Sequence, residues 1–260
     1  MKTRVYDLPT RLFHGVFAAS FVAAFAIANG VDDESQRFAY HMLAGLLMLF
    51  VLAWRLVWGL IGSRHARFTD FQLNPAALLR YLAAVFSGQT TNGHPSSEQE
   101  TREPKPSEQK HKWAGHNPAS SWAAIAMFAL AIGLGVTGYL MASGDAEAYE
   151  DLHELFANSF FVVVLLHIAG VVLHQLKHRD QLGLSMLTGN KQQLDQTATP
   201  VRSHTLVAIL MLVATLWFGR YLLQQFDANS GTLQLFGTTL QLTEQEGGES
   251  GEGDEQDDDD

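Results

Sequence analysis

Five apolar blocks, separated by strongly polar segments, dominate the pattern of this chain. A membrane span needs roughly 20 mostly apolar residues to cross a ~30 Å hydrocarbon core. The second, third and fourth blocks meet that length, the first is short, and Arg220 interrupts the fifth near its end. The pattern therefore predicts an all-α transmembrane helical bundle, a four-helix core with a fifth C-terminal helix, rather than a soluble bundle. The blocks are Leu12–Ala28, Phe38–Ile61, Ala119–Ala142, Leu155–Leu176 and His204–Leu223.

The basic residues of the polar segments predict the orientation. With the N-terminus inside, 14 of the 17 Lys and Arg residues lie in inner segments. The outer loops contain one basic residue, Arg37, and eight acidic residues. Lys and Arg accumulate on the cytoplasmic side of spans. We therefore expect a multi-pass membrane protein with its N-terminus inside and its C-terminus outside. The inner segments are 1–11, 62–118 and 177–203, and the outer loops are 29–37 and 143–154.

The first block raises a processing alternative, because it ends in the A-x-A pattern Ala26-Ile27-Ala28 that signal peptidases favour. Its apolar run is long for a signal peptide and contains His14. We expect a retained span.

The long inner segment and the C-terminus define the remaining organisation. Asn74-Pro75 and Asn117-Pro118 are N-cap and first-turn signals, which predict an amphipathic surface helix over 76–86 and the start of the third span. The stretch 87–112 is polar and predicts a flexible loop. Three units follow: 1–191, four spans at about 12–30, 38–61, 119–142 and 153–176; 192–225, a fifth helix with its preceding loop; and 226–260, an acidic outer tail expected to be disordered.

Composition narrows the chemistry. The chain has no cysteine, which excludes disulfides, iron–sulfur clusters and covalently attached c-type haem. Its net charge is −10, and 11 of its 27 acids lie in the tail. Such a run is usually solvated, although it could steer a basic partner on the outer side. It argues against binding to nucleic acid.

Four histidines lie at matched depths in the predicted spans. His153 and His167 are 14 residues apart, about 40° short of four helical turns, so they share a face and are separated by ~21 Å. His41, near the outer start of the second span, matches His153 in depth. His14, near the inner start of the first span, matches His167. Two stacked bis-histidine sites in a helical bundle are what two b-type haems require.

Two alternatives compete for these histidines. Each could be a polar group hydrogen-bonded between helices, or the set could line a proton path. Matched depths of four residues favour the haem interpretation. Metal transport is not favoured, because it needs histidines and carboxylates at one depth.

Neighbouring residues extend the predicted site. Small residues, Gly45 one turn from His41 and Gly15 beside His14, would leave room for a haem plane, as would Gly170 and the glycines of the third span. Arg11 and Arg55 could neutralise haem propionates, although for Arg55 we favour a snorkelling anchor. His116, at the inner surface, is a possible quinone contact or a plain capping-region residue. His174 is interpreted as interfacial rather than as a substitute ligand. The glycines of the third span are Gly133, Gly135 and Gly138.

Several stretches together resemble the bacterial cytochrome b561 family, which includes the cytochrome b subunit of membrane-bound nickel–iron hydrogenases. The similarity covers about residues 4–191. It is carried by VYDLPTRLFHG at 5–15, HMLAGLLMLFVLAWRLVWGLIGSRHARF at 41–68, GHNPASSWAAIAMFALAIGLGVTGYL at 115–140, LHELFANSFFVVVLLHIAGVVLH at 152–174 and MLTGNK at 186–191.

The resemblance implies a dihaem, four-helix electron carrier that exchanges electrons with quinone, with His14, His41, His153 and His167 as axial ligands. Together with the orientation, it implies a protein of the bacterial inner membrane, with its N-terminus cytoplasmic and its C-terminus periplasmic. Gly15 stands where members of the family usually have Trp, and His65 lies within a stretch of the family, SRxARF, that is usually basic and aromatic. The expected function is electron transfer between membrane quinone and a periplasmic redox partner such as a c-type cytochrome. The alternatives are a haem-bearing anchor for a catalytic hydrogenase or dehydrogenase subunit, and a stand-alone oxidoreductase acting on superoxide, which acidic outer loops disfavour.

Overall fold

The computed structural model describes residues 2–33, 35–86, 117–178, 182–192 and 200–243. The loop predicted over 87–112, His116 and the tail beyond residue 243 lie outside the described residues.

The first two long helices form an antiparallel pair. α1 (Leu8–Gly30) begins at Asp7, whose side chain accepts a hydrogen bond of 2.9 Å from the backbone N–H of Thr10, and Pro9 lies in its first turn. A short 3-10 turn, η1 (Gln36–Phe38), leads into α2 (Ala39–Ile61). The capping carboxylate and the early proline fix the helix start, because they satisfy or avoid the unpaired N–H groups there.

A second antiparallel pair follows. α4 (Pro118–Leu140) has the predicted Asn117 cap, whose side chain accepts from the Ser120 N–H at 2.8 Å. The chain reverses in η3 (Met141–Asp145), where Gly144 has φ 117°, a conformation that favours glycine. α5 (Ala146–His178) therefore starts within the predicted outer loop 143–154, which is largely helical.

The C-terminal region differs from the sequence prediction. α7 (Thr205–Gln225) covers the last of the five apolar blocks. It leads directly into an antiparallel sheet of β3 (Phe226–Asp227), β4 (Thr232–Leu235) and β5 (Thr238–Gln241). The prediction that disorder begins at residue 226 is wrong, because Leu233 and Leu240 face each other across the hairpin and are fully buried.

Short elements lie at the end of the bundle where α1 starts. β1 (Lys2–Arg4) pairs antiparallel with β2 (Asn190–Gln192), which follows α6 (Leu182–Thr188). The 3-10 turn η2 (Phe68–Asp70) precedes α3 (Pro75–Phe86). α3 is the predicted amphipathic helix, and Asn74 caps it by accepting from the Ala76 N–H at 2.9 Å.

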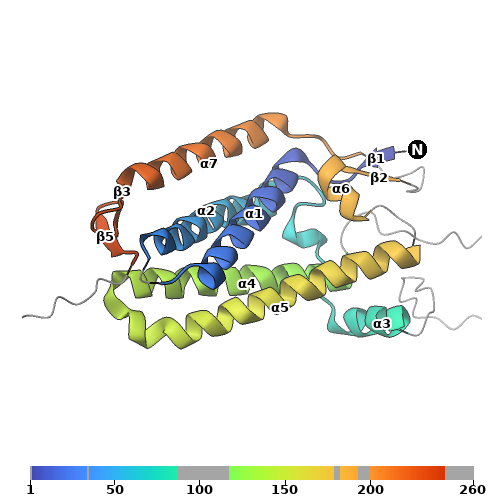
Figure 1. The fold of residues 1–260 in the computed structure, drawn as a ribbon. Helices are drawn as coiled ribbons and strands as arrows, with labels where there is room; N and C mark the ends of the chain where they lie inside the picture. The colour runs from blue at the N-terminus through green and yellow to red at the C-terminus, as the bar shows by residue number, and fades with distance from the viewer. Residues whose placement is uncertain (1, 34, 87–116, 179–181, 193–199, 244–260) are drawn as a thin grey trace, which may run out of the picture.

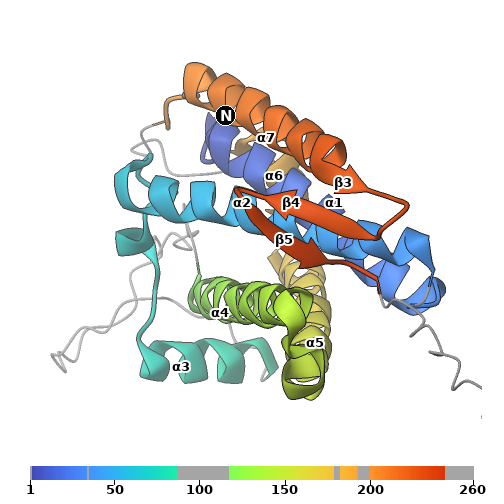
Figure 2. The ribbon, with the colours of Figure 1, turned by 90° about the vertical axis from the view of Figure 1, so that its left-hand side faces the viewer.

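The helices form two layers, with α1, α2 and α7 on one side and α4 and α5 on the other (Figure 1). We call the end with β1 and α6 the proximal end, and the end with η3 and the C-terminal hairpin the distal end. Viewed onto the distal end, the hairpin lies across α2 (Figure 2). The two layers meet in a hydrophobic core rich in phenylalanine. Its buried members are Phe13, Phe17, Met48, Val51, Leu52, Phe71, Phe128, Ala131, Phe160 and Met211.

The surface of the helices is apolar. Four stretches of the described chain are long and apolar enough to cross a membrane: 8–30, 36–61, 118–176 and 205–225. The third contains both α4 and α5. Many exposed side chains on these helices are leucine and valine, such as Leu166, Leu206 and Leu216. Because a large exposed apolar surface marks contact with lipid or a partner, these helices identify a membrane protein.

Candidate functional site

At the distal end, the rings of His41 and His153 face each other. His41 comes from the first turn of α2 and His153 from the second turn of α5. Their ring centroids are 6.1 Å apart, with an interplanar angle of 71°. An imidazole nitrogen lies about 2 Å from a metal ion that it binds, so two rings on opposite sides of one ion have centroids about 6 Å apart. The spacing therefore fits two imidazoles on opposite sides of one metal ion.

Hydrogen bonds fix the tautomer of both distal rings. Nδ1 of His41 lies 2.9 Å from the backbone oxygen of Ala24, which can only accept, so this nitrogen carries the proton. Nδ1 of His153 lies 2.8 Å from the Thr137 hydroxyl oxygen. That hydroxyl donates to backbone oxygens one turn back in α4, at 2.9 Å for Gly133, so its oxygen accepts from His153. A neutral ring with its proton on Nδ1 leaves the lone pair of Nε2 free, the arrangement typical of metal-binding histidine.

The proximal pair is more open. His14 is exposed on α1 and His167 is half-buried on α5. The two rings lie close enough to interact electrostatically.

A phenylalanine cluster fills the space between the two histidine pairs. Phe160 lies seven residues from both His153 and His167 and is 1% exposed. Its ring centroid is 4.7 Å from that of Phe21 and 6.1 Å from that of Phe17, both on α1. These rings keep α1 and α5 in contact and exclude water from the middle of the bundle.

The predicted glycines divide into two groups. A Cβ atom built on Gly15, Gly45 or Gly170 would meet nothing within 4 Å, so open space lies beside three of the four histidines. The glycines of α4 are different, because their surfaces are occupied by neighbouring side chains rather than left open. They allow close packing instead: Phe156 lies against Gly133, Leu49 against Gly135 and His153 against Gly138.

Arg55 is buried and does not snorkel, contrary to the interpretation favoured from the sequence. Its side chain is 4% exposed, and its Cζ lies 5.2 Å from the ring centroid of Phe68 and 5.7 Å from that of Phe128. Asp7 interacts with it electrostatically. The buried Nη1 atom of Arg55 has no hydrogen-bond partner among the described residues. A buried donor of this kind is free to bind water, an ion or another acceptor.

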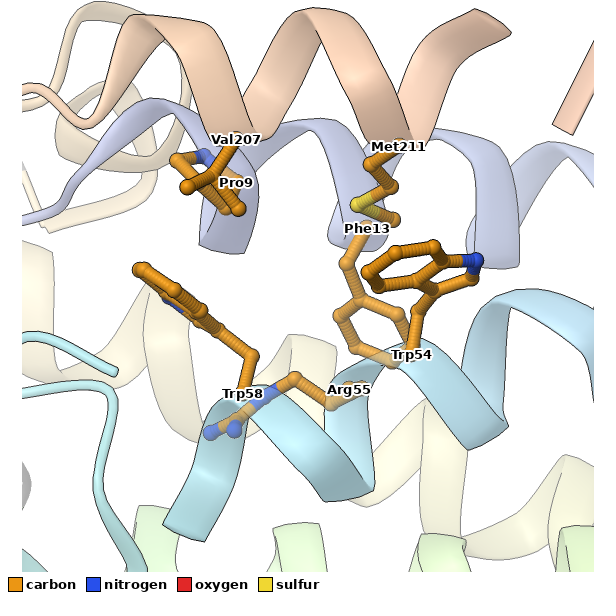
Figure 3. Close-up of a pocket in the computed structure, with 7 residues that line it drawn as sticks. All are labelled: Pro9, Phe13, Trp54, Arg55, Trp58, Val207 and Met211. Carbon is orange, nitrogen blue, oxygen red and sulfur yellow. The ribbon is translucent and has the colours of Figure 1, made fainter. Parts of the chain in front are cut away.

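A small apolar pocket borders Arg55 where α7 packs over α1 and α2 (Figure 3). Trp58, one of its walls, donates from Nε1 to Oδ2 of Asp7 at 3.0 Å, and Asp7 is fully buried. The other lining residues are Pro9, Phe13, Trp54, Val207 and Met211.

The remaining predicted residues have different surroundings. The Arg11 guanidinium donates to the backbone oxygens of Met186 and Leu187 at the C-terminal end of α6, so it already has acceptors of its own. Nδ1 of His174 is hydrogen-bonded to the Tyr81 hydroxyl of α3 at 3.1 Å. His65 pairs with Asp70 at 2.9 Å. Thr137, which the sequence analysis missed, carries no local signal, since its partner is 16 residues away.

No group of three or more His, Cys, Asp or Glu residues that could hold a metal ion occurs in the described parts of the chain. The histidines that lie close together form pairs, His41 with His153 and His14 with His167.

The fold and the site define a membrane-spanning helical bundle with paired histidines on facing helices. A family model described as prokaryotic cytochrome b561 matches residues 5–189, and the chain belongs to this family. Membership implies membrane electron transfer with haem b. Comparisons with curated proteins and with solved structures gave no match.

Proposed function

We propose that the protein is a dihaem cytochrome b that crosses the bacterial inner membrane five times and carries electrons between membrane quinone and a periplasmic redox partner. A c-type cytochrome is one such partner. The five crossings would be α1, α2, α4, α5 and α7. The observation that carries the proposal is the distal pair, with its ring spacing of 6.1 Å, in a chain of this family.

In the distal site, His41 and His153 would hold the iron through Nε2. The Ala24 carbonyl and the Thr137 hydroxyl orient the two rings from behind through Nδ1. Such outer partners fix the ring orientation and raise the basicity of the ligand. Gly45, one turn below His41, leaves space beside the ligand for the macrocycle.

In the proximal site, His14 and His167 would form the second ligand pair, with Gly15 and Gly170 beside them. Arg55 supplies the unpaired buried N–H that would bind a carboxylate side chain of the haem. Its phenylalanine surroundings exclude water, which strengthens such an ion pair.

Haem iron supplies reversible uptake of one electron, and the chain supplies ligation, orientation and an apolar shell. Phe160 and its neighbours on α1 keep the interval between the ligand pairs dry and closely packed. Ligands 14 residues apart on α5 place the two sites ~21 Å apart along the helix.

The distribution of Lys and Arg supports a cytoplasmic proximal end and a periplasmic distal end. Electrons would then reach the periplasmic partner through the distal site. His116 remains a prediction as a quinone contact.

Haem content of purified variants tests the ligand assignment. We expect the wild-type protein to bind two haems b with reducible absorption spectra. His41→Ala and His153→Ala should each lose the same haem, and His14→Ala and His167→Ala the other, leaving about one per chain. Quantitative haem extraction with redox titration measures this.

His174→Ala is the matched control, because His174 lies on the same helix and is hydrogen-bonded to Tyr81. It should retain both haems. Two haems in all four ligand variants, or a wild-type protein without b-type spectra, would contradict the proposal.

A further inference from the structure

The turn of the C-terminal hairpin exposes a large aromatic side chain. Phe236 is 73% exposed and has φ 49°, in the left-handed region of the backbone. That conformation is uncommon for a bulky residue and costs conformational energy, whereas asparagine or glycine adopts it readily. A hydrophobic ring held out in a strained turn needs a reason other than the stability of the turn itself.

The turn is fixed against α7 by Tyr221. The Phe236 N–H donates to the Tyr221 hydroxyl at 3.0 Å, and that hydroxyl donates to the backbone oxygen of Gln234 at 3.3 Å. The ring of Phe236 stacks on that of Tyr221, with centroids 5.4 Å apart and planes 17° apart. Tyr221 in turn stacks on Trp217, at 5.8 Å and 18°. The three rings form a continuous row that starts on α7 and ends at the hairpin tip.

The position of this row along α7 gives its depth. The 21 residues of α7 extend ~31 Å at 1.5 Å per residue, about the thickness of the hydrocarbon core. Trp217 and Tyr221 lie about two turns and one turn before its distal end. Tyr40, at the start of α2, and Tyr139, at the end of α4, are exposed at the same end of the bundle. Trp and Tyr concentrate at membrane–water interfaces.

The row continues the exposed apolar side of α7. Leu216 and Leu223 are exposed on the same helix, and Trp217 is 59% exposed. A surface continuous with a span's apolar exterior faces lipid, which favours lipid over a protein partner.

We propose that the C-terminal hairpin is a membrane-interface element whose tip, Phe236, inserts its ring among the lipid headgroups of the distal leaflet. Tyr221 holds the strained turn at that depth, and Trp217 anchors the same row from the helix. The burial of the Phe236 ring compensates the cost of its backbone conformation. This inference requires α7 to span the membrane but does not depend on haem.

Site-directed spin labelling tests the depth, since the chain has no native cysteine. We would label Phe236→Cys in the full-length protein, reconstituted in phosphatidylethanolamine–phosphatidylglycerol vesicles. Power-saturation EPR then compares accessibility to oxygen with that to a water-soluble nickel chelate. We expect the oxygen-to-nickel ratio at position 236 to be several-fold above that of Thr239→Cys, an exposed polar site on β5, and to approach that of Trp217→Cys.

Two outcomes would overturn the proposal. A ratio equal to that of the Thr239→Cys label would place the tip in water. Protection of the label from both reagents would place it in a protein contact, either with a second copy or with a partner.

A pair of side-chain variants separates anchoring from turn stability. Phe236→Asn loses the ring stack on Tyr221, but it suits the left-handed backbone and keeps the N–H bond to Tyr221, so the turn itself should persist. In vesicles it should nevertheless be cleaved by an added protease several-fold faster than Phe236→Trp, which keeps an interfacial ring. Equal cleavage of the two variants would argue against insertion of the ring.

Discussion

A single hydroxyl group determines how His153 is presented. The Thr137 hydroxyl accepts a hydrogen bond from the Nδ1–H of the ring and donates one to a backbone oxygen of α4. The hydrogen bond is part-buried, so water is a poor substitute for the hydroxyl. An unmet buried donor costs about 1–3 kcal/mol, and a free ring can rotate Nε2 away from its partner histidine.

Thr137→Val keeps the shape of the side chain but removes the acceptor. We expect the affinity of the distal site for haem to fall about 10–100-fold, the usual effect of losing an outer partner of a metal ligand. Haem titration of apoprotein, followed by absorption, measures the change. Thr137→Ser should restore binding, and an unchanged Thr137→Val protein would remove Thr137 from the site.

Arg55 permits a test of the proximal site. A buried positive charge favours the reduced form of a nearby redox centre, so Arg55→Leu should lower the midpoint potential of the proximal haem. A loss of ~1.4 kcal/mol of electrostatic stabilisation corresponds to about 60 mV for one electron. Potentiometric titration of the α-band measures it.

Arg220→Leu provides the comparison, because Arg220 is exposed on α7 at the other end of the bundle. It should leave the proximal potential unchanged. Arg55→Leu paired with Asp7→Asn separates the effect from the cost of leaving Asp7 buried without its cation. Potentials unaffected by either Arg55 variant would exclude Arg55 from the proximal site.

At the scale of elements, the hairpin that follows α7 joins the two layers at the distal end. Leu233 and Leu240 pack in one buried cluster with Ala39 and Leu43 of α2 and with Ala142 of η3. α2 carries His41, and η3 leads into the helix that carries His153. The hairpin therefore holds the two halves of the distal site together from outside the family-matched region.

Leu240→Ala should loosen this connection. Truncation of a fully buried leucine to alanine costs about 2–5 kcal/mol. We expect faster proteolysis of the hairpin and selective loss of the distal haem, with the proximal haem retained. Thr238→Ala, an exposed change on the same strand, should have neither effect. Loss of both haems together would show that the hairpin stabilises the whole bundle instead.

Much of this architecture could be predicted from the sequence, because apolar runs and Asn-Pro signals mark helices without tertiary information. The depths of His41 and His153 sufficed to expect their pairing, which the structure shows. The hairpin escaped prediction because the charge of the last residues dominated the interpretation of everything after residue 226. The burial of Arg55 also escaped, since its aromatic partners come from three separate segments.

At the scale of the whole molecule, the ends are unlike. The proximal end is closed by β1–β2 pairing and carries most of the basic residues that the structure describes, whereas the distal end carries the hairpin. This polarity predicts that a redox partner of positive surface charge would approach the distal end.

Reporter fusions test the polarity. Alkaline phosphatase fused after the C-terminus should be active, because the enzyme folds only in the periplasm, and a fusion within residues 87–116 should be inactive. The reverse pattern would invert the assignment of proximal and distal ends to the two sides of the membrane.

The two Nδ1 hydrogen bonds have a consequence for biogenesis. His41 is oriented by α1 and His153 by α4, in each case the long helix just before its own in the chain. Each half of the distal site is therefore complete within one helical hairpin as that hairpin leaves the ribosome and enters the bilayer. We therefore expect the cofactor to bind after both helical hairpins have formed and packed together, late in the assembly of the protein.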